Sequence, residues 1–343
     1  MKRTLLGTLM LVTLTACQDF TTAPSDRTPI DRAPALSREV GSTEMPGPGV
    51  TAVGHLYAVV SQVGVLQSGK GVTQVHRFGT GRYEVTFNTN VRSCGFQATT
   101  TNAYSQALDV FTASGHLSAQ GVYVETKNQG GGLTDGPFNL VVTCGNDGIP
   151  FVVVGYGANY LRGSAGTSLS YQGAGRYTVN FPTAVNGCAF LATVADSGNA
   201  LVYSPSYVFT AKGSTATSIY IETKNPGGGL QDGVPFHVAA VCPSVPGTRY
   251  AVVNANGTLS RANPGTKSSR LATGKFQITH LQNITGCARL ATRGSTGTGV
   301  PFNPARMEIA PAAGSGASGV WVRELAFFGA NFTNQSFHLG VVC

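Results

Sequence analysis

The chain has 343 residues, among them 45 glycines, 23 lysines and arginines and only 15 acidic residues, and its formal net charge is +8. No segment has the apolar period of an amphipathic helix, and glycines separate short apolar runs, so the composition argues against a helical fold. The few acidic residues include no recurring pair in a setting that would separate two carboxyl pKa values. The sequence therefore gives an enzyme no positive support, although β-sandwiches can build active sites from dispersed residues.

The first 17 residues, MKRTLLGTLMLVTLTAC, have the form of an export signal. Lys2 and Arg3 precede an apolar run over residues 5–12, which is too short to remain as a membrane span. The final LTAC resembles the lipobox of bacterial lipoproteins. This resemblance implies a signal peptide over residues 1–16, lipidation of Cys17 (palmitate among its acyl chains) and membrane anchoring. An ordinary signal peptide with an incidental cysteine is the alternative.

Residues 17–49 are rich in Pro, Ser, Thr and charged side chains and lack an apolar period. Such a segment cannot bury enough apolar surface to fold, so we predict a flexible lipidated tether. Gln18 follows the lipid cysteine. In lipoproteins of bacteria with two membranes, the absence of Asp at this place favours the outer membrane, so the resemblance implies that location and leaves the periplasmic or surface face open.

One pattern occurs three times at intervals of 94 to 101 residues and defines repeats over residues 50–144, 151–242 and 248–343. Each repeat is long enough to bury its own core. Alternation of apolar and polar residues, as in Tyr83, Val85 and Phe87, predicts half-buried strands. Turn signals every 8 to 12 residues predict about seven or eight strands per repeat. We therefore predict an all-β fold of three tandem antiparallel β-sandwich domains.

Six cysteines remain when Cys17 is set aside, and six cysteines allow 15 pairings. Because the same two positions recur in every repeat, the economical pairing is Cys94–Cys144, Cys188–Cys242 and Cys287–Cys343. A closed loop of about 50 residues stabilises a domain by roughly 4 kcal/mol in the chain-entropy model. The competing assignment is metal ligation, but no CxxC motif or paired histidine accompanies the cysteines, so we predict neither a metal nor a cofactor.

Several segments together resemble a module of exported bacterial proteins over residues 50–343. They are YAVVNANGTL, the G-[RK]-[YF] turns, the ETKN-x-GGG hairpins and the PFHxxxxC endings. The resemblance supports the repeat boundaries and implies no activity. Repeat 3 departs from it, because WVRELAFFGANFTNQSFHL replaces the glycine-rich hairpin.

The hairpins over residues 125–135 and 222–232 each bring two carboxylates and an asparagine close to glycines. These oxygen atoms could hold Ca²⁺, but Lys127 and Lys224 lie in their midst. We favour structural hairpins in which Asn and Asp bond to nearby backbone.

Tyr123, Tyr220 and Trp321 occupy equivalent positions between core residues, so we expect each ring to face away from its core. An outward ring can stack on a sugar or a partner protein, or a neighbouring loop or the next domain can cover it. His237 and His338 are also equivalent, and we interpret them as surface or loop-bonded side chains, not catalytic ones.

Repeat 3 carries nine cationic and two acidic residues, whereas repeats 1 and 2 are nearly neutral. This distribution, together with Trp321, makes Arg289, Arg293 and Arg323 candidate binding residues for an anionic glycan or another envelope protein. Nucleic acid is not an expected partner, because an exported chain without a recognised binding motif offers it no site.

The sequence as a whole favours a lipid-anchored protein of the cell envelope with a non-enzymatic binding, adhesion or spacer role and repeat 3 as its contact. The alternatives are an envelope enzyme acting on glycans and a structural subunit of a surface assembly. The sequence leaves open the ligand, the oligomeric state and the packing of the repeats on one another.

Overall fold

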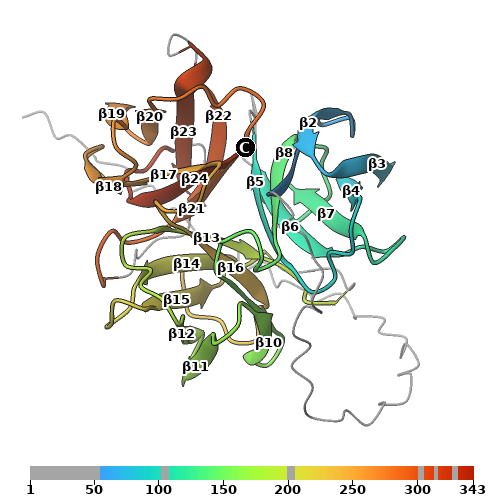
Figure 1. Cartoon of the computed structure of the whole chain (residues 1–343), viewed down its shortest axis with the longest axis horizontal. Helices are drawn as coiled ribbons and strands as arrows, with labels where there is room; N and C mark the ends of the chain where they lie inside the picture. Colours follow the sequence, from blue (N-terminus) through green and yellow to red (C-terminus); the bar gives the residue numbers. More distant parts are fainter. Residues whose placement is uncertain (1–54, 102–107, 199–204, 300–304, 313–315, 327–330) are drawn as a thin grey trace, which may run out of the picture. The chain divides into compact units, whose positions relative to one another are not determined.

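The computed structural model describes residues 55–101, 108–198, 205–299, 305–312, 316–326 and 331–343 (Figure 1). The predicted signal peptide, the lipidation site Cys17 and the tether lie outside these residues. Among the described residues, no helix combines the length and apolarity needed to cross a membrane.

Repeat 1 is an antiparallel sandwich of two four-stranded sheets. We name the sheet β2-β1-β8-β5 the central sheet and the sheet β3-β4-β7-β6 the peripheral sheet. The predicted alternation sets the faces, since Tyr83, Val85 and Phe87 point into the sandwich and are fully buried. The strands are β1 (Leu56–Val60), β2 (Leu66–Lys70), β3 (Val72–Gly79), β4 (Arg82–Phe87), β5 (Gly95–Thr100), β6 (Asp109–Ser114), β7 (Gly121–Lys127) and β8 (Phe138–Thr143).

Repeats 2 and 3 have the same topology (Figure 1). In repeat 2 the strands are β9 (Phe151–Gly155), β10 (Asn159–Gly163), β11 (Ser168–Gly173), β12 (Arg176–Asn180), β13 (Ala189–Val194), β14 (Tyr207–Lys212), β15 (Ser218–Lys224) and β16 (Phe236–Val241). In repeat 3 they are β17 (Thr248–Val253), β18 (Leu259–Ala262), β19 (Lys267–Ala272), β20 (Lys275–Thr279), β21 (Ala288–Arg293), β22 (Ala305–Pro311), β23 (Gly319–Ala326) and β24 (Phe337–Val342), with a short 3₁₀ turn η1 (Gly316–Ser318). The predicted all-β fold of three sandwiches is confirmed.

All three predicted disulfides are present, namely Cys94–Cys144, Cys188–Cys242 and Cys287–Cys343. Each joins the start of one strand of a central sheet to the end of its neighbour, as Cys94 before β5 and Cys144 after β8 illustrate. Disulfides persist in oxidising compartments, so these three bonds indicate an exported protein.

Each sandwich has its own apolar core, and a further core is shared by all three repeats. Val141 of repeat 1, Leu191 of repeat 2 and Leu290 of repeat 3 all belong to the shared core. It forms on the faces of the central sheets that point away from the sandwiches. Because neighbouring repeats cover these outer faces, every residue of β8, β16 and β24 is buried, although the alternation of apolar and polar residues predicts one solvent-exposed face.

Hydrogen bonds around the shared core close the three repeats into a ring. In each step, a backbone N–H of one repeat donates to a threonine hydroxyl of the next, and the last step returns from repeat 3 to repeat 1. The donor and acceptor pairs are Ala98 to Thr193 at 2.8 Å, Ala192 to Thr292 at 2.8 Å and Ala291 to Thr99 at 3.0 Å. The three repeats therefore pack into one structural unit and are not independent domains joined by linkers.

A second set of contacts has the same cyclic order. Arg162 of repeat 2 donates to the Cys94 carbonyl at 3.1 Å, and Arg261 of repeat 3 donates to the Cys188 carbonyl at 2.8 Å. At the corresponding place in repeat 1, the Ser68 hydroxyl donates to a carbonyl of repeat 3, that of Gly286, at 2.6 Å.

His237 and His338 correct the expectation of surface side chains, whereas the loop-bonded alternative holds for His338, whose Nε2 lies 3.1 Å from the carbonyl oxygen of the loop residue Ser295. Both point away from their own sandwich, as the strand period requires, but the neighbouring repeat covers them and they are fully buried. The N–H of Phe96 donates to Nδ1 of His237 at 2.9 Å, and the N–H of Phe190 donates to Nδ1 of His338 at 2.8 Å. They are interface residues and not surface residues. Burial lowers the pKa of His338 to about 3 and moves the pKa of His237 in the same direction.

Candidate functional site

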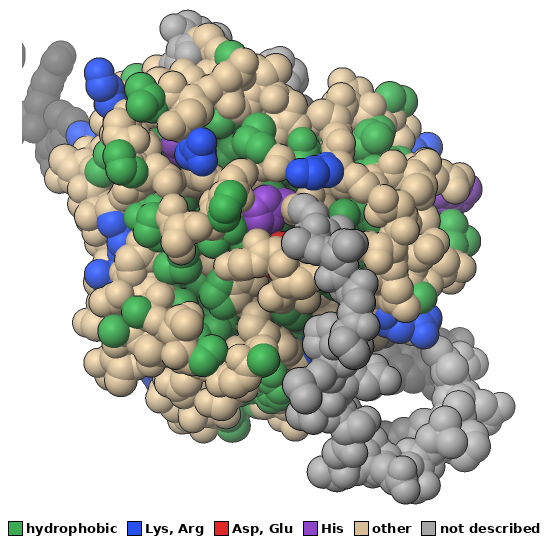
Figure 2. Space-filling view, in the orientation of Figure 1, with side chains coloured by type: hydrophobic (Ala, Val, Ile, Leu, Met, Phe, Trp, Pro, Cys, Tyr) green, Lys and Arg blue, Asp and Glu red, His purple; other side chains and the backbone are tan. Residues whose placement is uncertain are grey.

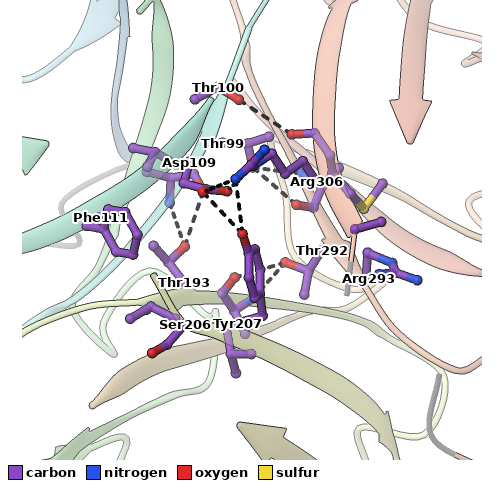
Figure 3. Close-up of a pocket in the computed structure, with 18 of the residues that line it drawn as sticks. Thr99, Thr100, Asp109, Phe111, Thr193, Ser206, Tyr207, Thr292, Arg293 and Arg306 are labelled. Atoms are coloured by element: carbon purple, nitrogen blue, oxygen red, sulfur yellow. Dashed lines mark hydrogen bonds and ion pairs between the residues drawn. The ribbon is translucent and has the colours of Figure 1, made fainter. Parts of the chain in front are cut away.

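Three equivalent residues of different type meet where the repeats come together (Figure 3). Asp109 begins β6, Tyr207 begins β14, and Arg306 lies in the corresponding part of β22. Nε and Nη2 of Arg306 donate to the two carboxylate oxygens of Asp109 at 2.9 and 3.0 Å, and the Tyr207 hydroxyl donates to Asp109 Oδ2 at 3.2 Å. Burial raises the pKa of Asp109, and its bonds to Arg306 and Tyr207 oppose that change.

A hollow of about 100 Å³ lies beside this cluster and is lined by strands of all three repeats. Typical ligand pockets have volumes of roughly 300 to 1,000 Å³, so this hollow is too small for most organic ligands. Every charged group of the cluster already has a partner. The arrangement thus serves to hold the repeats together.

The candidate arginines of repeat 3 do not form one patch. Arg293 lines the small hollow, is 2% exposed and lies over the ring of Phe209 at 5.4 Å. Arg289 belongs to the central sheet and donates to the Ile284 carbonyl at 3.0 Å. Arg323 belongs to the peripheral sheet, pairs with Glu308 and lies over the ring of Trp321 at 5.6 Å. Figure 2 likewise shows cationic side chains scattered singly over the drawn face.

The three equivalent aromatic residues face away from their cores, but their surroundings differ. In repeat 1 the imidazole of His116 stacks on the Tyr123 ring, with centroids 3.9 Å apart and planes 8° from parallel. Phe78 adds a second ring at 5.8 Å, and Tyr123 is only 4% exposed. In repeat 1, a turn of the chain thus covers the aromatic ring.

Glu84 holds that turn in place. Its buried carboxylate accepts the N–H of His116 at 2.8 Å and the N–H of Leu117 at 3.1 Å. Glu84 is opposite Tyr123 in the sheet, and the residue opposite Tyr220 in repeat 2 is Thr178. Repeat 2 therefore has no carboxylate to draw its turn over the ring.

The corresponding turn of repeat 2 is also shorter and carries a smaller residue. It closes from Gly213 to Ser218, whereas the turn of repeat 1 closes from Gly115 to Gly121, and Ser214 stands where repeat 1 has His116. An open hollow of about 500 Å³ remains over the ring, which we name the Tyr220 hollow. Its lining includes Gln172, Thr178, Lys212, Ser214, Tyr220 and, from repeat 3, Thr298.

The Tyr220 ring is held in place from its outer end. Its hydroxyl donates to Glu222 at 3.0 Å, and Glu222 pairs with Lys224 at 3.0 Å. Burial, followed by the bond to Glu222, raises the pKa of Tyr220 to about 12, so the phenol is neutral at physiological pH. The flat face of the ring, and not its hydroxyl, is thus the part available to a ligand.

The two glycine-rich hairpins are structural, as we favoured. Oδ1 of Asn128 accepts the N–H groups of Gly130 and Gly132 at 2.9 and 3.0 Å, and Oδ1 of Asn225 accepts that of Gly229 at 3.1 Å. Lys127 is buried against Glu125 at 2.8 Å. Within the described ranges, no group of His, Cys, Asp and Glu side chains is arranged to hold a metal ion.

Sequence reasoning identified Tyr220 but not the polar residues around it. Gln172 and Lys212 lie 40 residues apart in the sequence, on the two edge strands of one sheet. The signal that could have found the hollow is the comparison of the repeats, which places Thr178 and Ser214 where repeat 1 has Glu84 and His116. Comparisons with protein-family models, with curated proteins and with solved structures found no match to this chain.

Proposed function

We propose that this chain is a lipid-anchored protein of the bacterial cell envelope whose role is binding, with the Tyr220 hollow as its contact site. The lipobox-like LTAC sequence and the three disulfides support export and anchoring. The observation that carries the binding role is the difference between repeats 1 and 2. Repeat 1 covers its outward aromatic ring with His116, whereas repeat 2 leaves Tyr220 open in a hollow of ligand size.

The burial of repeat 3 cations is the reason for placing the contact on repeat 2. Arg261 and Arg306 bond to groups of neighbouring repeats, and Arg293 is buried beside the small hollow. These three of the nine cations serve the interfaces between repeats, so that part of the positive charge of repeat 3 is not offered on its outer surface.

An enzyme is the less favoured candidate. Glycoside hydrolysis needs two carboxyl groups facing a substrate. In the described part of the chain, each of the ten acidic side chains already accepts a hydrogen bond or pairs with a cation. A catalytic pair would therefore have to be released from structural bonds.

The anchoring part of the proposal is tested by cell fractionation with metabolic palmitate labelling. We expect the chain in the membrane fraction with the label attached, and we expect Cys17→Ser to abolish the label. An unlabelled wild-type chain in the aqueous fraction would contradict lipid anchoring.

The binding part is tested by co-sedimentation of the purified full chain, in mild detergent, with isolated envelope fragments. Tyr220→Ala should reduce the bound fraction, and the matched control Tyr160→Ala, an exposed tyrosine of the same repeat, should leave it unchanged. Equal sedimentation of both variants with wild type would contradict a contact at the Tyr220 hollow.

A further inference from the structure

The Tyr220 hollow combines one aromatic face with several polar groups. Nε2 of Gln172 donates to Oγ1 of Thr178 at 2.9 Å, so the Thr178 hydroxyl hydrogen is free to donate outward, and the exposed Ser214 hydroxyl lies at the rim. Ligand sites typically join an apolar surface to a few placed polar groups. The aromatic face and the polar groups of this hollow together suit a ligand ring that has one apolar face and hydroxyl groups around its edge.

Lys212 adds a positive charge to one side of the hollow. Its backbone N–H bonds to Gly297 of repeat 3, which fixes the end of the strand. No carboxylate of the described residues forms an ion pair with its ammonium group. Burial, followed by the charge of Arg261, lowers the pKa of Lys212. An anionic group of a ligand would find an unneutralised partner here.

Repeat 1 shows what fits over this ring. At the equivalent position, the imidazole of His116 lies parallel to the Tyr123 ring at 3.9 Å. The same sheet geometry therefore accepts a ring-sized group stacked on the aromatic face. In repeat 2 the chain does not supply that group itself.

We propose that the Tyr220 hollow binds one acidic sugar residue, a uronic acid type of ring, with its C–H face stacked on Tyr220 and its carboxylate at Lys212. This proposal rests on the binding role proposed above and adds the class of ligand. Gln172, Thr178 and Ser214 exchange hydrogen bonds with the sugar hydroxyls. The openness of the hollow favours a sugar at the end of a glycan chain over a free sugar acid.

The test is a ligand-observed NMR titration of the full chain in mild detergent. The probe is methyl β-glucuronide, the matched neutral control is methyl β-glucoside, and free glucuronate distinguishes a free acid from a chain end. The charged hydrogen bond should make the glucuronide bind about tenfold more tightly than the glucoside. Stacking should shift the sugar ring protons upfield.

Five variants locate the site. Tyr220→Ala should weaken glucuronide binding about tenfold or more, whereas Tyr220→Phe should retain it, because the hydroxyl is engaged with Glu222. Lys212→Gln should make the two sugars bind equally. Ser214→His, at an exposed position, should weaken binding by placing an imidazole at the rim of the hollow, and Ser214→His combined with Thr178→Glu should block binding, because the added carboxylate can hold the turn over the ring as Glu84 does in repeat 1.

The outcomes separate the two proposals. Tight glucuronide binding that survives both Tyr220→Ala and Ser214→His, or no glucuronide binding at all, would overturn the acidic-sugar assignment. If the glucuronide does not bind but Ser214→His still reduces co-sedimentation with envelope fragments, the binding role stands and only the ligand class fails. If neither is observed, both proposals fail.

Discussion

Asp109, Tyr207 and Arg306 occupy one position of the repeat, yet they are an acid, a phenol and a base. Their side chains bond to one another where the three repeats meet, so three identical residues could not make the same contact. The cluster therefore joins one residue of each repeat at the point where all three meet. The contribution of the cluster to the free energy of unfolding depends on both charges being present, because a buried charge without a partner destabilises the folded state.

Arg306→Met is expected to lower the free energy of unfolding by about 3 to 5 kcal/mol, because it leaves the Asp109 carboxylate, only 10% exposed, without its cation. Adding Asp109→Leu should recover most of that loss, since two apolar side chains can replace the ion pair. Urea unfolding of the two single variants and the double variant measures the coupling. Additive losses in the double variant would show that the two residues do not act as a pair.

Glu324 is a buried acid whose position in repeats 1 and 2 is held by a threonine. Burial raises its pKa to about 8, and the nearby Arg293 charge opposes this change. The folded chain therefore holds a proton that the unfolded chain loses near pH 4.5. This contribution to stability is fully present at low pH and is lost as the pH rises through about 8.

We expect the free energy of unfolding to fall by roughly 2 to 4 kcal/mol between about pH 5 and about pH 9 because of this group. Glu324→Gln should flatten that part of the profile, and urea titrations at several pH values provide the measurement. An unchanged slope in the variant would mean that Glu324 is already ionised in the folded protein.

At the scale of strands, the two faces of each central sheet are buried by different partners. The side facing the sandwich follows the alternation seen in Phe138, Leu140 and Val142. The other side carries Asn139 and Val141 and is covered by neighbouring repeats. His237 and His338 lie on this covered side of β16 and β24, where each accepts a backbone N–H from the preceding repeat.

These histidines predict a sensitivity to acid. Their folded pKa values are depressed by burial, so the stability that they contribute is present above about pH 6.5 and is lost as the pH falls, toward about 3 for His338. For His338 we expect a loss of roughly 2 kcal/mol between about pH 6.5 and about pH 4.5, and for His237 a loss in the same direction. Unfolding of His237→Asn and His338→Asn, which use the residue of repeat 1, should show a smaller slope. Identical slopes in wild type and variants would contradict the assignment.

Strand periodicity predicted the sandwiches and the repeated cysteines predicted the disulfides, because both signals act within one repeat. The covered faces were not predictable in the same way. Thr99, Thr193 and Thr292 alternate with core residues and are polar, as solvent-exposed positions of a strand usually are. In the structure, however, their hydroxyl groups accept hydrogen bonds from neighbouring repeats. Similarly, Tyr123 and Tyr220 have the same local sequence pattern, and only the distant contact of Glu84 with His116 tells them apart.

At the scale of the whole molecule, ring closure makes the stability of each repeat depend on the other two. A repeat expressed alone would expose residues of the shared core such as Leu191, Val241 and Val153. Removing neighbours in this way costs about 25 cal/mol for each Å² of apolar surface exposed. The three repeats should therefore unfold together.

Trp321 is the only tryptophan of the chain and lies in repeat 3. Its fluorescence thus reports the unfolding of that repeat, whereas far-ultraviolet circular dichroism reports all three. We expect the two urea transitions of the disulfide-intact chain to coincide. A separate transition of Trp321 would indicate that repeat 3 unfolds independently and that the ring contributes little.

The measurement that tests the central claim most directly is a crystal structure of the full chain with methyl β-glucuronide. Our account predicts a sugar ring lying face-on over Tyr220 with its carboxylate against Lys212, and none over Tyr123, where His116 already lies. A sugar bound elsewhere, or a Tyr220 hollow that stays empty at saturating sugar, would contradict the account.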